Sequence, residues 1–172
     1  MKLILSESQL LHEWQLRFFP ENTAADYTME RIDGIDAENI LKARMEDWYR
    51  QLLHNGRMDM LNPIEIADKC KVTVTPEGNG YVTLPEGTLR VAGIEMEGWS
   101  GAAVITADLT GRIARLQQSP YTQGTAESPV AVVSGNRIDL YPAAGKLLSL
   151  TAVVDVPGVY ALDSAALATI TP

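Results

Sequence analysis

The sequence predicts an α+β fold in which N-terminal helices pack on a small antiparallel β-sheet or sandwich. Apolar side chains recur at helical spacing up to about residue 70 and at alternate positions after it. No helical pattern separates the predicted strands, so we expect antiparallel pairing without crossovers. With 172 residues, 46% of them hydrophobic, the chain is long enough to bury a core.

We therefore expect one domain overall, made of three regions. Residues 1–70 form a helical region, and residues 71–160 form an antiparallel β region that contains a long loop, 109–128. Residues 161–172 form a tail or a short helix.

The first predicted helix follows Ser6 in "SESQLLHEWQLRFF". Ser6 and Gln9 have the spacing of a capping box, in which each residue satisfies the other's backbone N–H. The apolar stripe of this helix is Leu10, Leu11, Trp14 and Phe18. Pro20 and "ENTAADY" are expected to end the element.

The second helix is predicted from Asp36 to His54, with Asn55-Gly56 as its C-terminal stop. Its expected apolar face is Ile40, Leu41, Met45, Trp48 and Leu52. "NPIEIADKC" then predicts a short third helix, with Asn62 as cap, Pro63 at the first helical position and Glu65 completing the cap.

The predicted strands begin after Cys70. "KVTVTP" and "GYVTLP" flank the turn "EGNG" and predict a hairpin. "TLRVAGIEMEGW" predicts a strand with a bulge at Gly93, where the alternation slips by one residue. "AAVITAD" and "KLLSLTAVVDV" predict two more strands, and "LDSAALATI" a short helix capped by Asp163 or Ser164.

A second hairpin is predicted between Pro129 and Pro142. Pro129 cannot donate to a ladder and fits the first residue of a strand. Ser134-Gly135-Asn136 reverses the chain, and Pro142 ends the return strand. The preceding loop, 109–128, is too long for a hairpin connection, and loops of that length are typically functional or disordered.

The charge balance excludes a general nucleic-acid-binding surface. The chain has 14 Lys and Arg against 22 Asp and Glu, a net charge of −8. Cys70 is the single cysteine, so no intrachain disulfide can form. The start "MKLILSESQ" lacks the apolar segment of a secretory signal and nothing later is long enough to span a membrane, so we expect a cytoplasmic protein.

Residue types that carry chemistry are present, but their contexts favour structural roles. His12 and His54 lie in helical stretches with no other His and no second Cys to complete a metal site. Cys70 has no identifiable base to lower its pKa. The glycines of "PEGNGYVTLPEG" precede a strand, whereas a phosphate loop precedes a helix.

The carboxylate pairs Glu95/Glu97 and Glu46/Asp47 have the positions of solvated strand and helix faces. We therefore expect no catalytic, cofactor-binding or metal-binding residue. Trp99 is the exception among the aromatic residues, because it ends a strand between Gly98 and Ser100-Gly101 beside the long loop. An interface role and core packing both remain open for it.

The middle and end of the chain contain a series of short motifs. They are Leu84-Pro85-Glu86, Leu89-Arg90-Val91, Gly98-Trp99, Tyr121-Thr122-Gln123-Gly124, Pro129-Val130-Ala131 and Leu140-Tyr141-Pro142. Over roughly residues 36–160 this series resembles the head–tail connector (tail tubular or ring) proteins of short-tailed bacteriophages and of gut Bacteroidetes phages or prophages. The sequence departs from that family at Gly87-Thr88, at Gln123 and in its short C-terminal helical part.

The resemblance implies a non-enzymatic virion assembly protein that forms an oligomeric ring between the portal and the tail. Its partners would be copies of itself and portal and tail proteins, with DNA passing through the centre without sequence-specific binding. It would be present in the bacterial cytoplasm during assembly and then in the virion. The loop would reach the next subunit, with Trp99, Arg112, Arg115, Tyr121 and Gln123 at the subunit interface.

Two other functions stay open on the sequence alone. One is a small bacterial adaptor or binding module with another partner. The other is an enzyme that uses an unrecognised carboxylate or thiol site.

Overall fold

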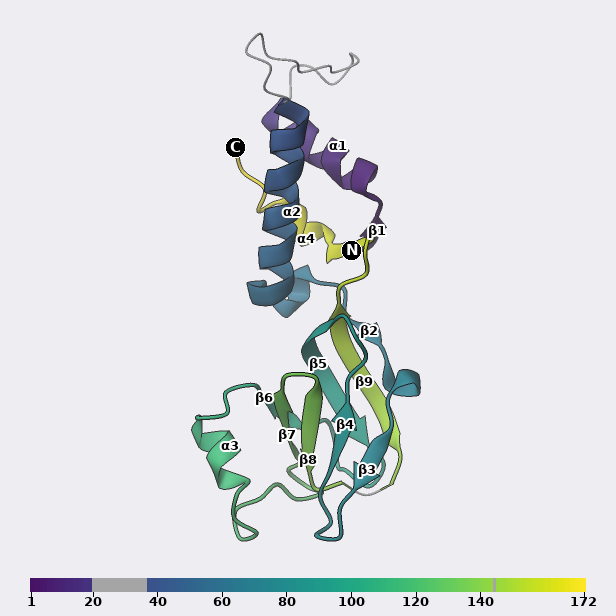
Figure 1. Ribbon diagram of the computed structural model, residues 1–172, viewed down its shortest axis with the longest axis vertical. Coiled ribbons are helices and arrows are strands. Elements are labelled where there is room, and N and C mark those ends of the chain that lie inside the picture. The colour runs from purple at the N-terminus through teal and green to yellow at the C-terminus, as the bar shows by residue number, and fades with distance from the viewer. Residues whose placement is uncertain (20–36, 144) are drawn as a thin grey trace. The chain divides into compact units, whose positions relative to one another are not determined.

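The computed structural model describes residues 1–19, 37–143 and 145–172, and they form an α+β fold (Figure 1). The chain divides into two compact units: residues 1–62 with 155–172, and residues 63–154. The sequence analysis placed the divisions near residues 70 and 160 within one domain. The first division comes earlier because residues 64–69 belong to the β-rich unit.

The first unit combines helices with a two-stranded sheet. Strand β1 (Lys2–Leu5) pairs antiparallel with β10 (Tyr160–Asp163), which also bridges to Leu61. Around this sheet the unit contains α1 (Glu7–Phe18), α2 (Ala37–Asn55), the 3₁₀ turn η2 (Met58–Met60) and α4 (Ser164–Leu167). Strand β1 was not predicted, since its partner lies at the other end of the chain.

Two helices begin at the caps that the sequence predicted. Ser6 and Gln9 form the capping box of α1. Asp163 caps α4 by accepting a hydrogen bond from the Ala165 N–H at 3.0 Å. The expected end of the first helix at Pro20 and "ENTAADY", and the expected start of the second at Asp36, lie outside the described residues.

The buried face of α2 is rotated relative to the predicted one. Leu41, Met45 and Leu52 are buried as expected, but Ile40 is 45% exposed. Tyr49 and Leu53 are buried instead, which completes a row at positions i, i+4, i+8 and i+12 from Leu41.

The predicted third helix is wrong. Residues 64–69 form β2 (Ile64–Glu65) and the 3₁₀ turn η3 (Ala67–Lys69). The Glu65 carboxylate accepts hydrogen bonds from the Leu150 N–H at 2.7 Å and from the Ser149 hydroxyl at 2.8 Å. This long-range pairing replaces the capping role that the local pattern suggested.

The second unit contains two sheets. The three-stranded sheet has the order β2-β9-β5 and is antiparallel throughout. The five-stranded sheet has the order β3-β4-β8-β7-β6. The strands are β3 (Val72–Val74), β4 (Gly80–Thr83), β5 (Thr88–Met96), β6 (Val104–Thr106), β7 (Val130–Ser134), β8 (Arg137–Tyr141) and β9 (Leu147–Val154).

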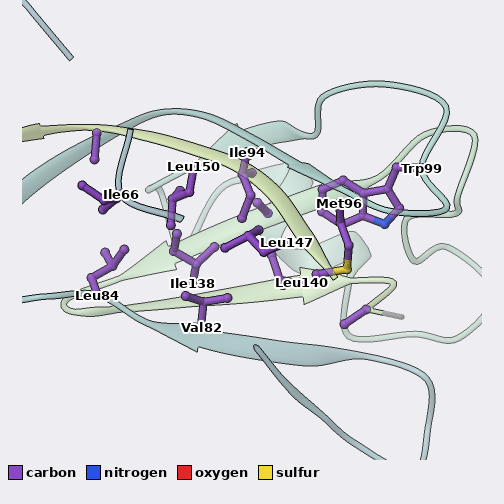
Figure 2. Close-up of a cluster of buried hydrophobic side chains, with 13 residues drawn as sticks. Ile66, Val82, Leu84, Ile94, Met96, Trp99, Ile138, Leu140, Leu147 and Leu150 are labelled. Atoms are coloured by element: carbon purple, nitrogen blue, oxygen red, sulfur yellow. The ribbon is translucent and has the colours of Figure 1, made fainter. Parts of the chain in front are cut away.

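A single cluster of buried side chains joins the two sheets. Val82 and Ile138 from one sheet meet Ile94 and Leu150 from the other, and each is at most 1% exposed (Figure 2). The bulge predicted at Gly93 is confirmed by a register shift between Val91 and Gly93. Both predicted hairpins, β3–β4 and β7–β8, are also confirmed.

The pair β6–β7 departs from the predicted pairing, because it is parallel. Val104 pairs with Val130 and Thr106 with Val132 in the same direction. Parallel neighbours need a crossover of a dozen or more residues. Residues 107–129, which contain the short helix α3 (Arg112–Leu116), supply that crossover.

Within the described ranges, no helix combines the length and the apolar character needed to cross a membrane.

Candidate interaction surface

The crossover 107–129 is the segment in which most of the predicted site residues lie. It leaves β6, forms an Asp108–Thr110 turn, and continues into α3. After a second turn at Ser119 it returns to β7. In Figure 1, α3 is drawn outside the sheet, beyond its β6 edge.

One side of the crossover is fastened to its own unit by amide side chains. Gln117 is only 4% exposed; its Oε1 accepts from the Gly124 N–H at 2.8 Å and its Nε2 donates to the Ile113 carbonyl at 2.9 Å. Gln123 donates to the Gln117 carbonyl at 3.0 Å and accepts from Asn79 at 3.4 Å. These bonds tie the crossover to the β3–β4 turn, where Asn79 lies.

The return part of the crossover lies directly on the sheet. A Cβ atom added at Gly124 would be 2.3 Å from the Tyr141 carbonyl oxygen and 2.9 Å from the Val130 nitrogen. The Ser100 N–H donates to the Ala126 carbonyl at 2.8 Å. In the loop 109–128, which the resemblance implies would reach the next subunit, the part around Gly124 and Ala126 therefore contacts its own unit.

The other side of the crossover carries apolar side chains in solvent. We call this set the outer face: Leu109, Ile113, Leu116 and Tyr121, together with Arg112 and Arg115. Tyr121 is 96% exposed, Leu109 52%, Ile113 39% and Leu116 37%. Both arginines are also exposed, and neither forms an ion pair with any residue that the structure describes.

The backbone that presents Tyr121 is held in place. The N–H groups of Thr122 and Gln123 both donate to the Ser119 carbonyl at 3.1 Å. The Thr122 hydroxyl donates to the Leu116 carbonyl. Because the turn is already ordered, placing Tyr121 against a partner would cost little conformational entropy.

Trp99 does not belong to the outer face. It is 9% exposed, lies in the cluster of Figure 2, and donates from Nε1 to the Pro142 carbonyl at 3.1 Å. Of the two roles left open by its sequence, this burial supports core packing.

The structure thus sorts the predicted interface residues into two groups. Arg112, Arg115 and Tyr121 are exposed, while Trp99 and Gln123 bond within their own unit. The role of the first three at a subunit interface stays a prediction.

Sequence reasoning missed Gln117, Leu109, Ile113 and Leu116. Residues 109–128 were predicted to be a loop, although Ile113 and Leu116 have the i, i+3 spacing of a helix. Gln117 gave no signal, because its burial depends on the returning backbone at Gly124.

The residues with catalytic potential are dispersed. His12 and His54 are exposed. Cys70 is half-buried, and burial, followed by the nearby charges of Asp68 and Glu65, raises the pKa of its thiol. Among the described residues, no group of three or more His, Cys, Asp or Glu side chains has the arrangement of a metal site.

The carboxylates singled out in the sequence lie in different surroundings. Glu95 on β5 is half-buried and Glu97, just beyond the strand, is exposed. The pKa of Glu65 is lowered, first by the Leu150 N–H and then by the Ser149 hydroxyl and Ala67 N–H, with burial opposing them. Glu65 therefore serves to join β2 to β9.

Neither a family model nor a curated protein matches this sequence.

Proposed function

We propose that this protein is a non-enzymatic structural subunit that assembles with copies of itself, as a head–tail connector forming a ring between the portal and the tail of a phage or prophage particle. The observation that carries the proposal is the outer face of the crossover. The family resemblance supplies the identity of the particle.

The composition of the outer face supports a protein partner. Interfaces are enriched in Tyr and Arg at their centres, and a few such residues supply most of the binding energy. Arg112 and Arg115 lie on the same short helix as the exposed Ile113 and Leu116, and the exposed Tyr121 follows in the next turn. The ordered turn at Ser119 provides the preorganisation that strengthens such contacts.

The charge distribution supports a second copy as that partner. Arg112 and Arg115 give the outer face a positive charge, while the chain as a whole carries −8. Opposite charges on the two surfaces favour encounter and orientation. An acidic ring would also let DNA pass, because it offers no cluster of cations to replace phosphate counterions.

The test is self-association of the full chain, measured by sedimentation velocity up to millimolar concentration. We expect the wild type to form closed oligomers and the double variant Ile113→Ser/Tyr121→Ser to remain monomeric. Leu148→Ser is the matched control, because Leu148 is 57% exposed but lies on β9, away from the crossover. Deleting residues 112–126, which the loop length alone would suggest, is not a clean test, since residues 123–126 are bonded to their own unit.

The proposal fails if the wild type is monomeric at every concentration, or if the double variant assembles like the wild type. A thermal unfolding curve for each variant checks that loss of assembly is not loss of folding.

The second candidate is a small bacterial adaptor or binding module, and the exposed Tyr121 favours it equally if the partner is another protein. A gene neighbourhood of portal, capsid and terminase genes separates the two, because an adaptor has no reason to be encoded there.

A further inference from the structure

The first unit contains an open pocket of about 180 Å³ between the C-terminal half of α2 and residues 155–160. Its lining includes the aromatic side chains Tyr49 and Tyr160, whose ring centroids are 4.8 Å apart. The Tyr49 hydroxyl accepts from the Ala161 N–H at 3.0 Å, which fixes its ring. Leu53 adds an aliphatic surface beside the rings.

The remaining lining is aliphatic and charged. Val156 is 45% exposed and Val159 37% exposed, so two large aliphatic side chains line the pocket and still face solvent. Glu46 and Asp155 contribute carboxylates, and Arg50 and His54 contribute basic groups. The Arg50 guanidinium lies 3.8 Å from the Asp47 carboxylate, which partly offsets its charge. An apolar surface flanked by charged groups is the anatomy of a protein-binding site.

We infer that this pocket receives Tyr121 of a second copy of the chain, with Arg112 and Arg115 of that copy beside Glu46 and Asp155. The inference rests on the proposed self-assembly and names its acceptor surface.

The size of the pocket suits a single aromatic ring. A protein cavity of about 150 Å³ accommodates benzene. A phenol ring is only slightly larger, and the pocket is open, so the Tyr121 hydroxyl can remain in contact with water. The aromatic and aliphatic lining would bury the ring, which is otherwise almost fully exposed.

Charge favours this pocket over the hollow beside Cys70. That hollow, about 440 Å³, includes Lys71 and Lys146 with Asp68 in its lining. Its net charge has the same sign as Arg112 and Arg115, so docking of the outer face there would bring like charges together.

The positions of the outer face and the pocket also fit an assembly of many copies. Tyr121 belongs to the second unit and the pocket to the first, so the two surfaces are different. When two copies bind through two different surfaces, one copy still has an unoccupied pocket and the other still has an unbound outer face. Such head-to-tail contacts generate rings or open filaments.

Photo-cross-linking tests the contact directly. A photoreactive p-benzoylphenylalanine replaces Tyr121 in the full chain, which keeps an aromatic ring at the position. We expect irradiation to yield covalent oligomers whose cross-linked peptides map to residues 46–54 or 155–160. Cross-links between copies that map elsewhere, or a cross-link only within one chain, would overturn the inference.

A double-mutant cycle tests the same contact through affinity. Val159→Lys places a cation in the pocket, and we expect it to weaken self-association about 30-fold, as a central interface residue does. Tyr121→Ala should weaken it by a similar factor, and the two together should be no worse than either alone. Ile40→Lys is the matched control, since Ile40 is 45% exposed on α2 but outside the pocket lining.

The outcomes separate the inference from the proposed function. If Tyr121→Ala abolishes assembly while Val159→Lys leaves it unchanged, self-assembly stands and the acceptor pocket is wrong. If the wild type does not self-associate, both are wrong.

Discussion

The two connections of strand β7 differ in almost every respect. On one side, Gly135-Asn136 joins β7 to its antiparallel neighbour β8. On the other, residues 107–129 join β6 to β7 in a parallel pair. The second connection is long because a parallel pair requires a return path, so its length alone is no sign of an arm. What makes it a candidate interaction surface is the exposure of its apolar side chains.

Each connection contains a glycine, but the two glycines are needed for different reasons. Substituting the glycine of the long connection is expected to have the largest effect on stability. At Gly124 an added Cβ would meet backbone atoms of Tyr141 and Val130, which cannot move without disturbing the sheet. We expect Gly124→Ala to lower the free energy of unfolding by about 3 kcal/mol in urea denaturation.

Gly135→Ala is the matched variant in the hairpin. Gly135 has φ of +60°, and nothing lies within 4 Å of an added Cβ, so only the backbone preference opposes the substitution. A loss of about 1–2 kcal/mol is expected there. Equal losses at both positions would contradict the close approach of the crossover to the sheet.

The next largest loss of stability is expected on removal of the Gln117 side-chain amide, which bonds two parts of the crossover to each other. Gln117→Ala leaves the Gly124 N–H and the Ile113 carbonyl without their side-chain partner. We expect a loss of about 2 kcal/mol, measured by thermal or chemical unfolding. Gln118→Ala, at the exposed neighbouring position, should change stability by less than about 0.5 kcal/mol.

A third variant compares the hydrogen bonds of a carboxylate, Glu65, with those of an uncharged amide, Gln117. The pKa of Glu65 is lowered in the folded chain, so its contribution is present above the pKa of the unfolded state and is lost as pH falls through the folded pKa. We expect Glu65→Gln to flatten the decline of unfolding free energy between about pH 5 and pH 3. Gln117→Ala should retain the wild-type pH dependence, because an amide does not titrate. An unchanged slope in Glu65→Gln would contradict the role of its carboxylate in joining β2 to β9.

The smallest effect is expected at the most exposed residue. Tyr121→Ser should change the free energy of unfolding by less than about 0.5 kcal/mol, since the side chain makes little contact with its own unit. A large loss of stability would show that Tyr121 packs within the chain, and the outer face would then lose its central residue.

Prediction from sequence succeeded where the signal was local. The capping box at Ser6, the bulge at Gly93 and the two hairpins depend on residues a few positions apart, and all are confirmed. It failed where a distant segment decided the outcome, as in β1, in the parallel pair β6–β7 and in residues 62–69, where Glu65 bonds to Leu150.

Prediction of the candidate surface also succeeded only in part. The five residues predicted from the sequence differ in the structure: Tyr121, Arg112 and Arg115 are exposed, whereas Trp99 lies in the core and Gln123 bonds within the crossover. Ile113 and Leu116 were missed because a five-residue helix gives too short a pattern to distinguish its exposed face.

The sequence by itself determined the fold class, most of the strands and the helix caps at Ser6 and Asp163, because backbone preference and the spacing of apolar side chains act over a few residues. Only the tertiary structure decided which side of residues 107–129 is buried. That choice depends on where Gly124 and Gln117 meet a sheet whose strands come together from distant parts of the chain.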